Sequence, residues 1–87
     1  MPVSFTISKG THLLRGNVEG GYNLSTDCDA TCVGTSDKFY YFSGYVETAN
    51  NDEESSFQID NPEDINGDTP NFPLFVEKDK VKNIRWQ

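Results

Sequence analysis

PNFPLFVEKDKVKNIRWQ, residues 70–87, is the stretch of sequence on which the fold interpretation depends. Two short apolar runs, 72–76 and 81–86, flank the charged residues 77–80. Aromatic and β-branched runs on either side of a short polar break are typical of strands that lie close together. The segment therefore predicts a β-hairpin or a tight strand corner, which ends at the only tryptophan, Trp86.

The length and composition predict that residues 1–87 form one β-rich domain. Hydrophobic residues make up 34% of the chain, and a large part of them are rings, namely six Phe, four Tyr and one Trp. Each ring can bury roughly 150–250 Å², which helps a chain of this size to build a sufficient core. Good helix formers such as Ala and Met are rare, whereas Thr, Val, Tyr and Phe favour strands.

Alternating apolar residues mark further strands before this stretch. Val3, Phe5 and Ile7 alternate with polar residues, and a second run covers 11–18, so the two predict an antiparallel hairpin. The longest strand is expected over 38–46, where rings occupy both faces, as in a central strand. Gly44 is expected to mark a bend or a bulge in it, and a short strand is expected over 55–59.

These elements predict an all-β fold of five to six short antiparallel strands, arranged as a small partly open barrel or a sandwich. The spacing is similar to the pattern of SH3-like and Sm-like barrels, in which a short turn separates the last two strands. Flexible loops are expected over 25–37, 47–55 and 60–71, where polar and turn-forming residues dominate.

The charge distribution points to the kind of partner. The formal net charge is −7, which disfavours direct binding of nucleic acid because such binding needs clustered Lys and Arg. Residues 47–68 contain eight acids and no Lys or Arg. A one-sided charge of this kind attracts a basic partner, although it can also be a solvated surface that keeps a small protein soluble.

We therefore expect a non-enzymatic acidic protein-binding module, an inhibitor or immunity-type partner that engages a basic surface on a nucleic-acid-handling protein, including a role as a nucleic-acid mimic. The alternatives are a small barrel that assembles through its edge strands and binds a ligand or RNA, and a structural component of a larger complex. No cofactor is expected, and the chain is expected to be a monomer or a small homo-oligomer. The expected partner-binding residues are Glu47, Asp52, Glu53, Glu54, Asp60, Glu63, Asp64, Asp68, Tyr41 and Tyr45.

Nothing in the sequence points to a membrane or to secretion. No stretch is long and apolar enough to span a bilayer, and the residues that follow Met1 lack a secretory pattern. A cytoplasmic location is the expectation.

The two cysteines and the only histidine are the candidate reactive side chains of the sequence. Cys28 and Cys32 are open to three interpretations: free thiols, a small disulfide clip, or part of a zinc site that lacks two of its four ligands. His12 has no evident nucleophile or orienting carboxylate beside it and is expected on the surface. No catalytic motif or metal-ligand cluster is present.

Residues 64–68 resemble the opening of an EF-hand or dockerin calcium loop, because oxygen-bearing side chains occupy the first, third and fifth positions. The pattern then fails, because Thr69 stands where glycine is needed and Phe75 stands where a carboxylate should close the cage. The segment is therefore expected to be an Asx turn, with no metal bound.

Overall fold

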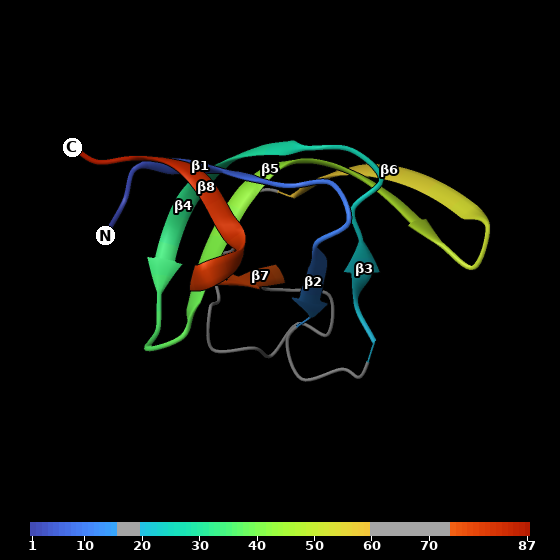
Figure 1. Cartoon of the computed structure of the whole chain (residues 1–87), viewed down its shortest axis with the longest axis horizontal. Coiled ribbons are helices and arrows are strands. Elements are labelled where there is room, and N and C mark those ends of the chain that lie inside the picture. The colour runs from blue at the N-terminus through green and yellow to red at the C-terminus, as the bar shows by residue number, and fades with distance from the viewer. Residues whose placement is uncertain (16–19, 60–73) are drawn as a thin grey trace.

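Eight strands and one short 3-10 helix make up the part of the chain described by the computed structural model, residues 1–15, 20–59 and 74–87 (Figure 1). The elements are β1 (Ser4–Ile7), β2 (His12–Arg15), β3 (Tyr22–Asn23), β4 (Cys28–Thr35), β5 (Phe39–Asn50), β6 (Glu53–Ile59), β7 (Leu74–Glu77), η1 (Lys78–Lys80) and β8 (Val81–Arg85).

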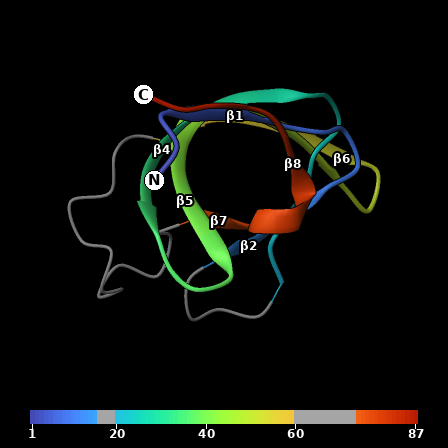
Figure 2. The same ribbon diagram turned by 60° about the vertical axis from the view of Figure 1, so that its left-hand side comes forward.

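One antiparallel sheet contains all eight strands. Its order is β3-β2-β7-β5-β4-β1-β8, and β6 pairs with β5 off this path. The sheet curls strongly, so that β1, β4, β5 and β7 surround a common interior, but its end strands β3 and β8 do not pair with each other (Figure 2). The prediction of a small all-β domain built as a partly open barrel or sandwich is confirmed.

The interior is filled by side chains from almost every strand. Phe5 of β1 stacks on Tyr40 of β5 with ring centroids 5.1 Å apart, and it meets the edge of Phe42 at 6.3 Å. Edge and offset contacts of this kind add to the burial of the rings. The other buried residues of the core are Ile7, Leu13, Leu24, Cys28, Ala30, Cys32, Val46, Ile59, Leu74 and Val76.

Strand β5 is the longest element and connects two parts of the fold. Its first half pairs with β4 and β7, and its second half, from Gly44 onward, pairs with β6. Gly44 lies where β5 changes partner, and a Cβ atom there would approach the carbonyl oxygen of Asp29 on β4 to 3.0 Å. A residue without a side chain therefore suits this close approach.

The last strands form a corner. Strand β7 pairs with β2 and β5, η1 turns the chain, and β8 pairs with β1, so β7 and β8 are not partners. Of the two predicted arrangements for residues 70–87, the strand corner is correct and the hairpin is not. Beside β8, the amide of Val3 donates to the carbonyl of Arg85 at 2.8 Å, which holds the two ends of the chain together.

Two further predictions were wrong, the first because the strand pairing is long-range and the second because the strand has an unusual composition. Strands β1 and β2 do not form a hairpin, since β1 pairs with β4 and β8 while β2 pairs with β3 and β7. Residues 25–37 are not a loop, since they contain the eight-residue strand β4. Its inward residues Cys28, Ala30 and Cys32 are small, so its period of two is weak in hydrophobicity.

The expected loop over 47–55 is also wrong. Strand β5 continues to Asn50 and β6 begins at Glu53, so only Asn51 and Asp52 form the turn. The exposed polar residues Glu47, Glu53, Glu54 and Ser55 belong to strands, since an antiparallel pair can leave one face in water, whereas Thr48 is buried. The expected loop over 60–71 lies outside the described residues. The expected strand over 55–59 falls within β6.

Candidate functional site

The turn that joins β5 to β6 fixes the register of this hairpin. Asn51 and Asp52 have φ angles of 51° and 67°, so both residues of the two-residue turn are left-handed. This is the requirement of a type I′ turn, whose twist matches that of paired strands, and Asn and Asp tolerate it better than most residues. The seven pairs that follow run from Asn50↔Glu53 to Gly44↔Ile59 without a register shift.

This register brings acidic and polar side chains together on the outer face of the hairpin. The pairs Tyr45↔Gln58, Glu47↔Ser56 and Ala49↔Glu54 alternate with pairs that face the core, such as Val46↔Phe57. The side chains of alternate residues lie on one face of a strand, so Glu47 and Glu54 are diagonal neighbours there. Asp52 lies in the turn and Glu53 on the opposite face. We call strands β5 and β6, together with Glu47, Asp52, Glu53 and Glu54, the acidic hairpin.

A shallow depression accompanies the two glutamates. It has a volume of about 480 Å³ and is lined by Ser25, Glu47, Thr48, Glu54, Ser55 and Ser56. Its walls are carboxylates and hydroxyl groups, so it can accept hydrogen bonds and attract cations. A slightly larger depression of about 510 Å³ lies elsewhere, but its lining mixes Lys9 and Lys80 with Glu77 and has no single sign of charge.

The four acids of the hairpin are exposed, and none of them has a charged partner among the described residues. In that part of the chain the ion pair is between Lys82 Nζ and Asp27 Oδ2, 3.3 Å apart. The pKa of Asp27 is lowered, first because the amide of Lys9 donates to its carboxylate at 2.7 Å and then because of Lys82. The hairpin acids have no such neutralising contacts with described residues, so their negative potential extends into the solvent.

Basic side chains gather away from the acidic hairpin. Lys78, Lys80 and Lys82 belong to η1 and β8, and the amide of Lys78 donates to the carbonyl of Lys38 at 2.9 Å, which joins the turn before β5 to this corner. Figure 1 shows the tip of the acidic hairpin at one end of the long axis and the η1–β8 corner well away from it. The acidic hairpin is therefore of one sign, whereas the η1–β8 corner mixes its lysines with the exposed acids Glu77 and Asp79.

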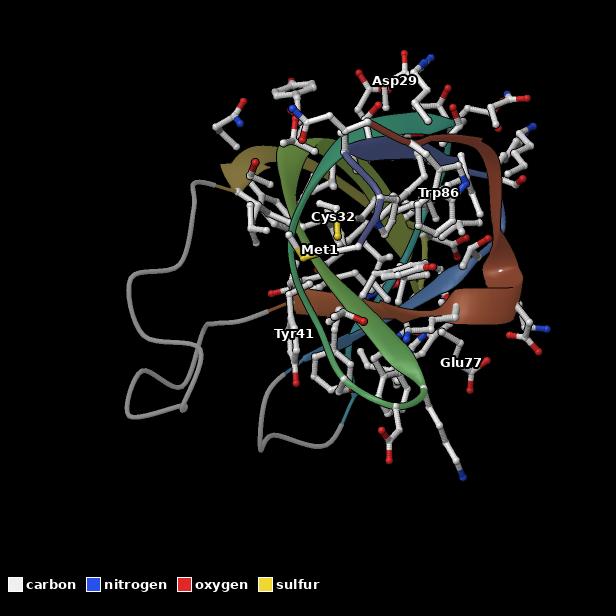
Figure 3. All side chains as sticks on the ribbon, turned by 90° about the vertical axis from the view of Figure 1, so that its left-hand side faces the viewer. Met1, Asp29, Cys32, Tyr41, Glu77 and Trp86 are labelled. Atoms are coloured by element: carbon white, nitrogen blue, oxygen red, sulfur yellow. The ribbon has the colours of Figure 1, made fainter. Side chains whose placement is uncertain are left out.

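The structure brings some of the predicted site residues together and separates others. Tyr45 is 54% exposed and lies two residues from Glu47 on the same face of β5. Tyr41 points outward from the first half of β5 and packs against Phe75 of β7, with ring centroids 5.6 Å apart (Figure 3). Six residues of strand separate Tyr41 from Glu47, which is about 20 Å, so Tyr41 is not part of the acidic hairpin.

Four of the predicted site residues belong to the segment between β6 and β7. Asp60, Glu63, Asp64 and Asp68 lie outside the described residues, and so does the segment 64–68 that resembles a calcium loop. The depression adds residues that the sequence analysis did not select, namely Ser25, Ser55 and Ser56. The alternation of Glu54, Ser56 and Gln58 was visible in the sequence. The position of Ser25 beside the hairpin was not, because it depends on a long-range bond in which the amide of Ser25 donates to the carbonyl of Glu47 at 2.9 Å.

Both cysteines are free and buried, so of the three interpretations the free thiols are correct. They are four residues apart along the extended strand β4, a separation of roughly 13 Å, which is too far for a disulfide. Figure 3 shows Cys32 inside the curled sheet. Burial raises the pKa of Cys28 to about 11, with a smaller contribution from the charge of Asp29, so its reactive thiolate form is disfavoured at neutral pH.

His12 is an exposed residue of β2, as expected. Its Nδ1 lies 2.7 Å from Asn23 Oδ1 and its Nε2 lies 3.2 Å from the carbonyl oxygen of Gly20. The two ring nitrogens of His12 on β2 therefore contact β3 through Asn23 and the chain just before β3 through Gly20. Within residues 1–15, 20–59 and 74–87, no three His, Cys, Asp or Glu side chains are grouped as metal ligands.

Among the described residues there is no helix long and apolar enough to cross a bilayer. Comparisons of the chain with protein-family models, with curated proteins and with solved structures gave no match.

Proposed function

We propose that this chain is a non-enzymatic acidic binding protein whose acidic hairpin engages a basic surface on another protein. The observation that carries the proposal is the position of Glu47, Asp52, Glu53 and Glu54, which are exposed on one hairpin that contains no Lys or Arg. None of the four is neutralised by a described residue. Exposed charges of one sign raise the rate of encounter with a surface of the opposite sign.

The partner class that fits this surface best is a protein that handles nucleic acid. Such proteins carry clusters of Lys and Arg that neutralise phosphates, and a surface of unpaired carboxylates can occupy the same cluster. The protein would then act as an inhibitor or immunity-type partner and, in the strongest form of the proposal, as a nucleic-acid mimic. A cytoplasmic setting belongs to the proposal, because both thiols are free and such compartments keep thiols reduced.

Tyr45 provides the apolar part of the proposed contact. Tyrosine is enriched at protein interfaces because it offers a large ring at a small entropic cost and a hydroxyl group that can bond. Its exposed ring beside Glu47 combines an aromatic anchor with charge. Binding of a partner would bury this ring, whereas a purely electrostatic attraction would leave it in water.

The proposal can be tested with immobilised protein and a lysate of the source organism. Wild type is compared with a variant carrying E47K, E53K and E54K, and with a control carrying D37K, E77K and D79K, whose three acids are exposed and lie outside the hairpin. Both variants change the net charge equally. We expect wild type and the control to retain the same basic protein, and the hairpin variant to lose it.

Salt and DNA sharpen the test. The Debye length falls from about 10 Å at 0.1 M to about 3 Å at 1 M salt, so retention should fall steeply over this range. Duplex DNA should release the partner if both compete for one basic cluster. Retention that is equal for both triple variants, or that does not change with salt, would show that the acidic hairpin is not the binding surface.

A further inference from the structure

The open edge of β6 is the feature of the described structure that says most about how a partner would bind. Strand β6 pairs with β5 along all seven of its residues without a register shift, and no described strand lies along its other edge. The end strand β3 has only two residues. The end strand β8 has a register shift in its pairing with β1, and its Asn83 has a φ of 52°. Irregularities of that kind discourage further pairing, and β6 has none.

The hydrogen bonds of β5 show which backbone groups of β6 face outward. The carbonyl of Glu47 accepts from the amide of Ser25, and the carbonyl of Tyr45 accepts from the thiol of Cys28, so both carbonyls point away from β6. In an antiparallel ladder, the residue opposite such a position also points its amide and carbonyl away from the partner strand. The residues opposite are Ser56 and Gln58, and the alternation extends to Glu54.

The same three residues place their side chains on the outer face. Glu54, Ser56 and Gln58 therefore present a free amide and carbonyl at the edge of the sheet and a polar or acidic side chain on the face beside Glu47 and Tyr45. A strand added at this edge would hydrogen-bond to these residues. Since side chains alternate along a strand, every second residue of the added strand would lie on the acidic face.

We propose that the edge of β6 accepts an extended segment of a partner as an additional strand, with Lys or Arg at alternate positions. The inference rests on the proposed function, because the cationic character of the segment follows from Glu47 and Glu54. Backbone hydrogen bonds to β6 provide the alignment, and the alternate cations select the segment, as in other cases of strand addition. A second copy of this chain is the competing occupant, and it would lack the charge complementarity.

The first experiment uses two synthetic ten-residue peptides of equal composition. One alternates lysine and valine, and the other has five lysines followed by five valines. Only the alternating peptide can place all its cations on the face of the sheet that carries Glu47 and Glu54 while it pairs with β6. We expect it to bind at least about fivefold more tightly, as a few cross-strand ion pairs allow, and to protect the amides of Ser56 and Gln58 from hydrogen exchange.

The second experiment removes a single outward amide. Ser56→Pro deletes the donor at the edge without removing a β5–β6 ladder bond or a charge, and proline is tolerated where a strand amide faces solvent. Ser56→Ala keeps the amide and serves as the matched control. We expect the proline variant to lose binding of the alternating peptide and the alanine variant to keep it, with the fold of each checked by amide spectra.

The outcomes separate the two proposals. If Glu47→Lys with Glu54→Lys abolishes binding of both peptides while Ser56→Pro has no effect, the acidic surface is right and strand addition is wrong. Equal binding of the two peptides, or no amide protection, also overturns strand addition. If the proline variant does not fold, alternating peptides methylated at their backbone nitrogens test the reciprocal bonds, in which the peptide amides donate to the outward carbonyls of Glu54, Ser56 and Gln58, and unchanged binding of these peptides refutes the proposal. A complex of two copies, without peptide, would identify self-pairing and contradict it as well.

Discussion

Replacing Asp52 with glycine should make the protein more stable, although the change removes a carboxylate from the acidic hairpin. Asp52 is exposed and has a φ of 67° in the turn between β5 and β6. Its side chain makes no hydrogen bond or ion pair with a described residue, so no such contact is lost there. The backbone conformation at this position therefore decides the effect.

The magnitude follows from two opposing terms. A residue with a Cβ atom pays about 1–2 kcal/mol in the left-handed region, whereas glycine loses about 0.5–1 kcal/mol more conformational freedom on folding. Taken at the middle of each range, the difference favours glycine over alanine by about 0.5–1 kcal/mol. For a domain of this size, that corresponds to a difference in melting temperature of about 2–8 °C. Aspartate should fall between the two, because its polar side chain tolerates this region better than alanine does.

The assay compares wild type, Asp52→Gly and Asp52→Ala by thermal and urea unfolding. Both variants remove the same charge, so any relief of repulsion among the acids is common to them. We expect the order glycine, wild type, alanine in melting temperature, with an unchanged slope of stability against urea concentration. An alanine variant that is as stable as the glycine variant would refute the assignment of a left-handed turn.

Three further predictions concern the core and the titrating groups. Phe42→Ala should cost about 3–5 kcal/mol, because Phe42 is fully buried, and the urea midpoint should fall accordingly; a loss below about 1 kcal/mol would contradict its central place. The pKa of Cys28 is raised from 9.0 to about 11 in the folded state, so stability should fall as the pH rises from 9 towards 11, and the fall should be smaller in Cys28→Ala. The pKa of Asp27 is lowered from 3.8 by Lys9 and Lys82, so its contribution is present above pH 3.8 and is lost as the pH falls below it, and Asp27→Asn should flatten the acid limb of the unfolding curve.

The fold class was predictable because the signals for it are local. Rings on both faces over 38–46 identify β5, and alternation at Val3, Phe5 and Ile7 identifies β1. These patterns need no knowledge of the partner strand. The reversal between β5 and β6 falls within the expected loop over 47–55, but its restriction to Asn51 and Asp52 was not predicted.

The pairing of strands was not predictable, because it depends on residues far apart in the chain. Ser4 pairs with Arg85 on one side and with Thr31 on the other, and nothing in the residues around Ser4 records either partner. Strand β4 was missed for a different reason. Its core-facing residues are small, and its outward residues are polar, so it resembles a loop in composition while it keeps the period of a strand.

The candidate site was predictable in part. The run of acids indicated the acidic hairpin, and Glu47, Asp52, Glu53 and Glu54 do lie on it. The faces on which they lie depend on the register of β5 and β6, which the turn length sets and which one residue more or less would reverse. Tyr41 was grouped with Tyr45 because both follow the same period, but the strand is long enough to carry them to different surroundings.

The meeting of the two chain ends has a practical consequence. Val3 is bonded to Arg85, and Figure 1 shows both ends far from the tip of the acidic hairpin. Donor and acceptor fluorophores attached to the first and last residues would therefore transfer energy efficiently in the folded protein and lose that transfer on denaturation. Occupation of the hairpin would leave the signal unchanged, so such a labelled protein would report integrity of the fold independently of what it binds.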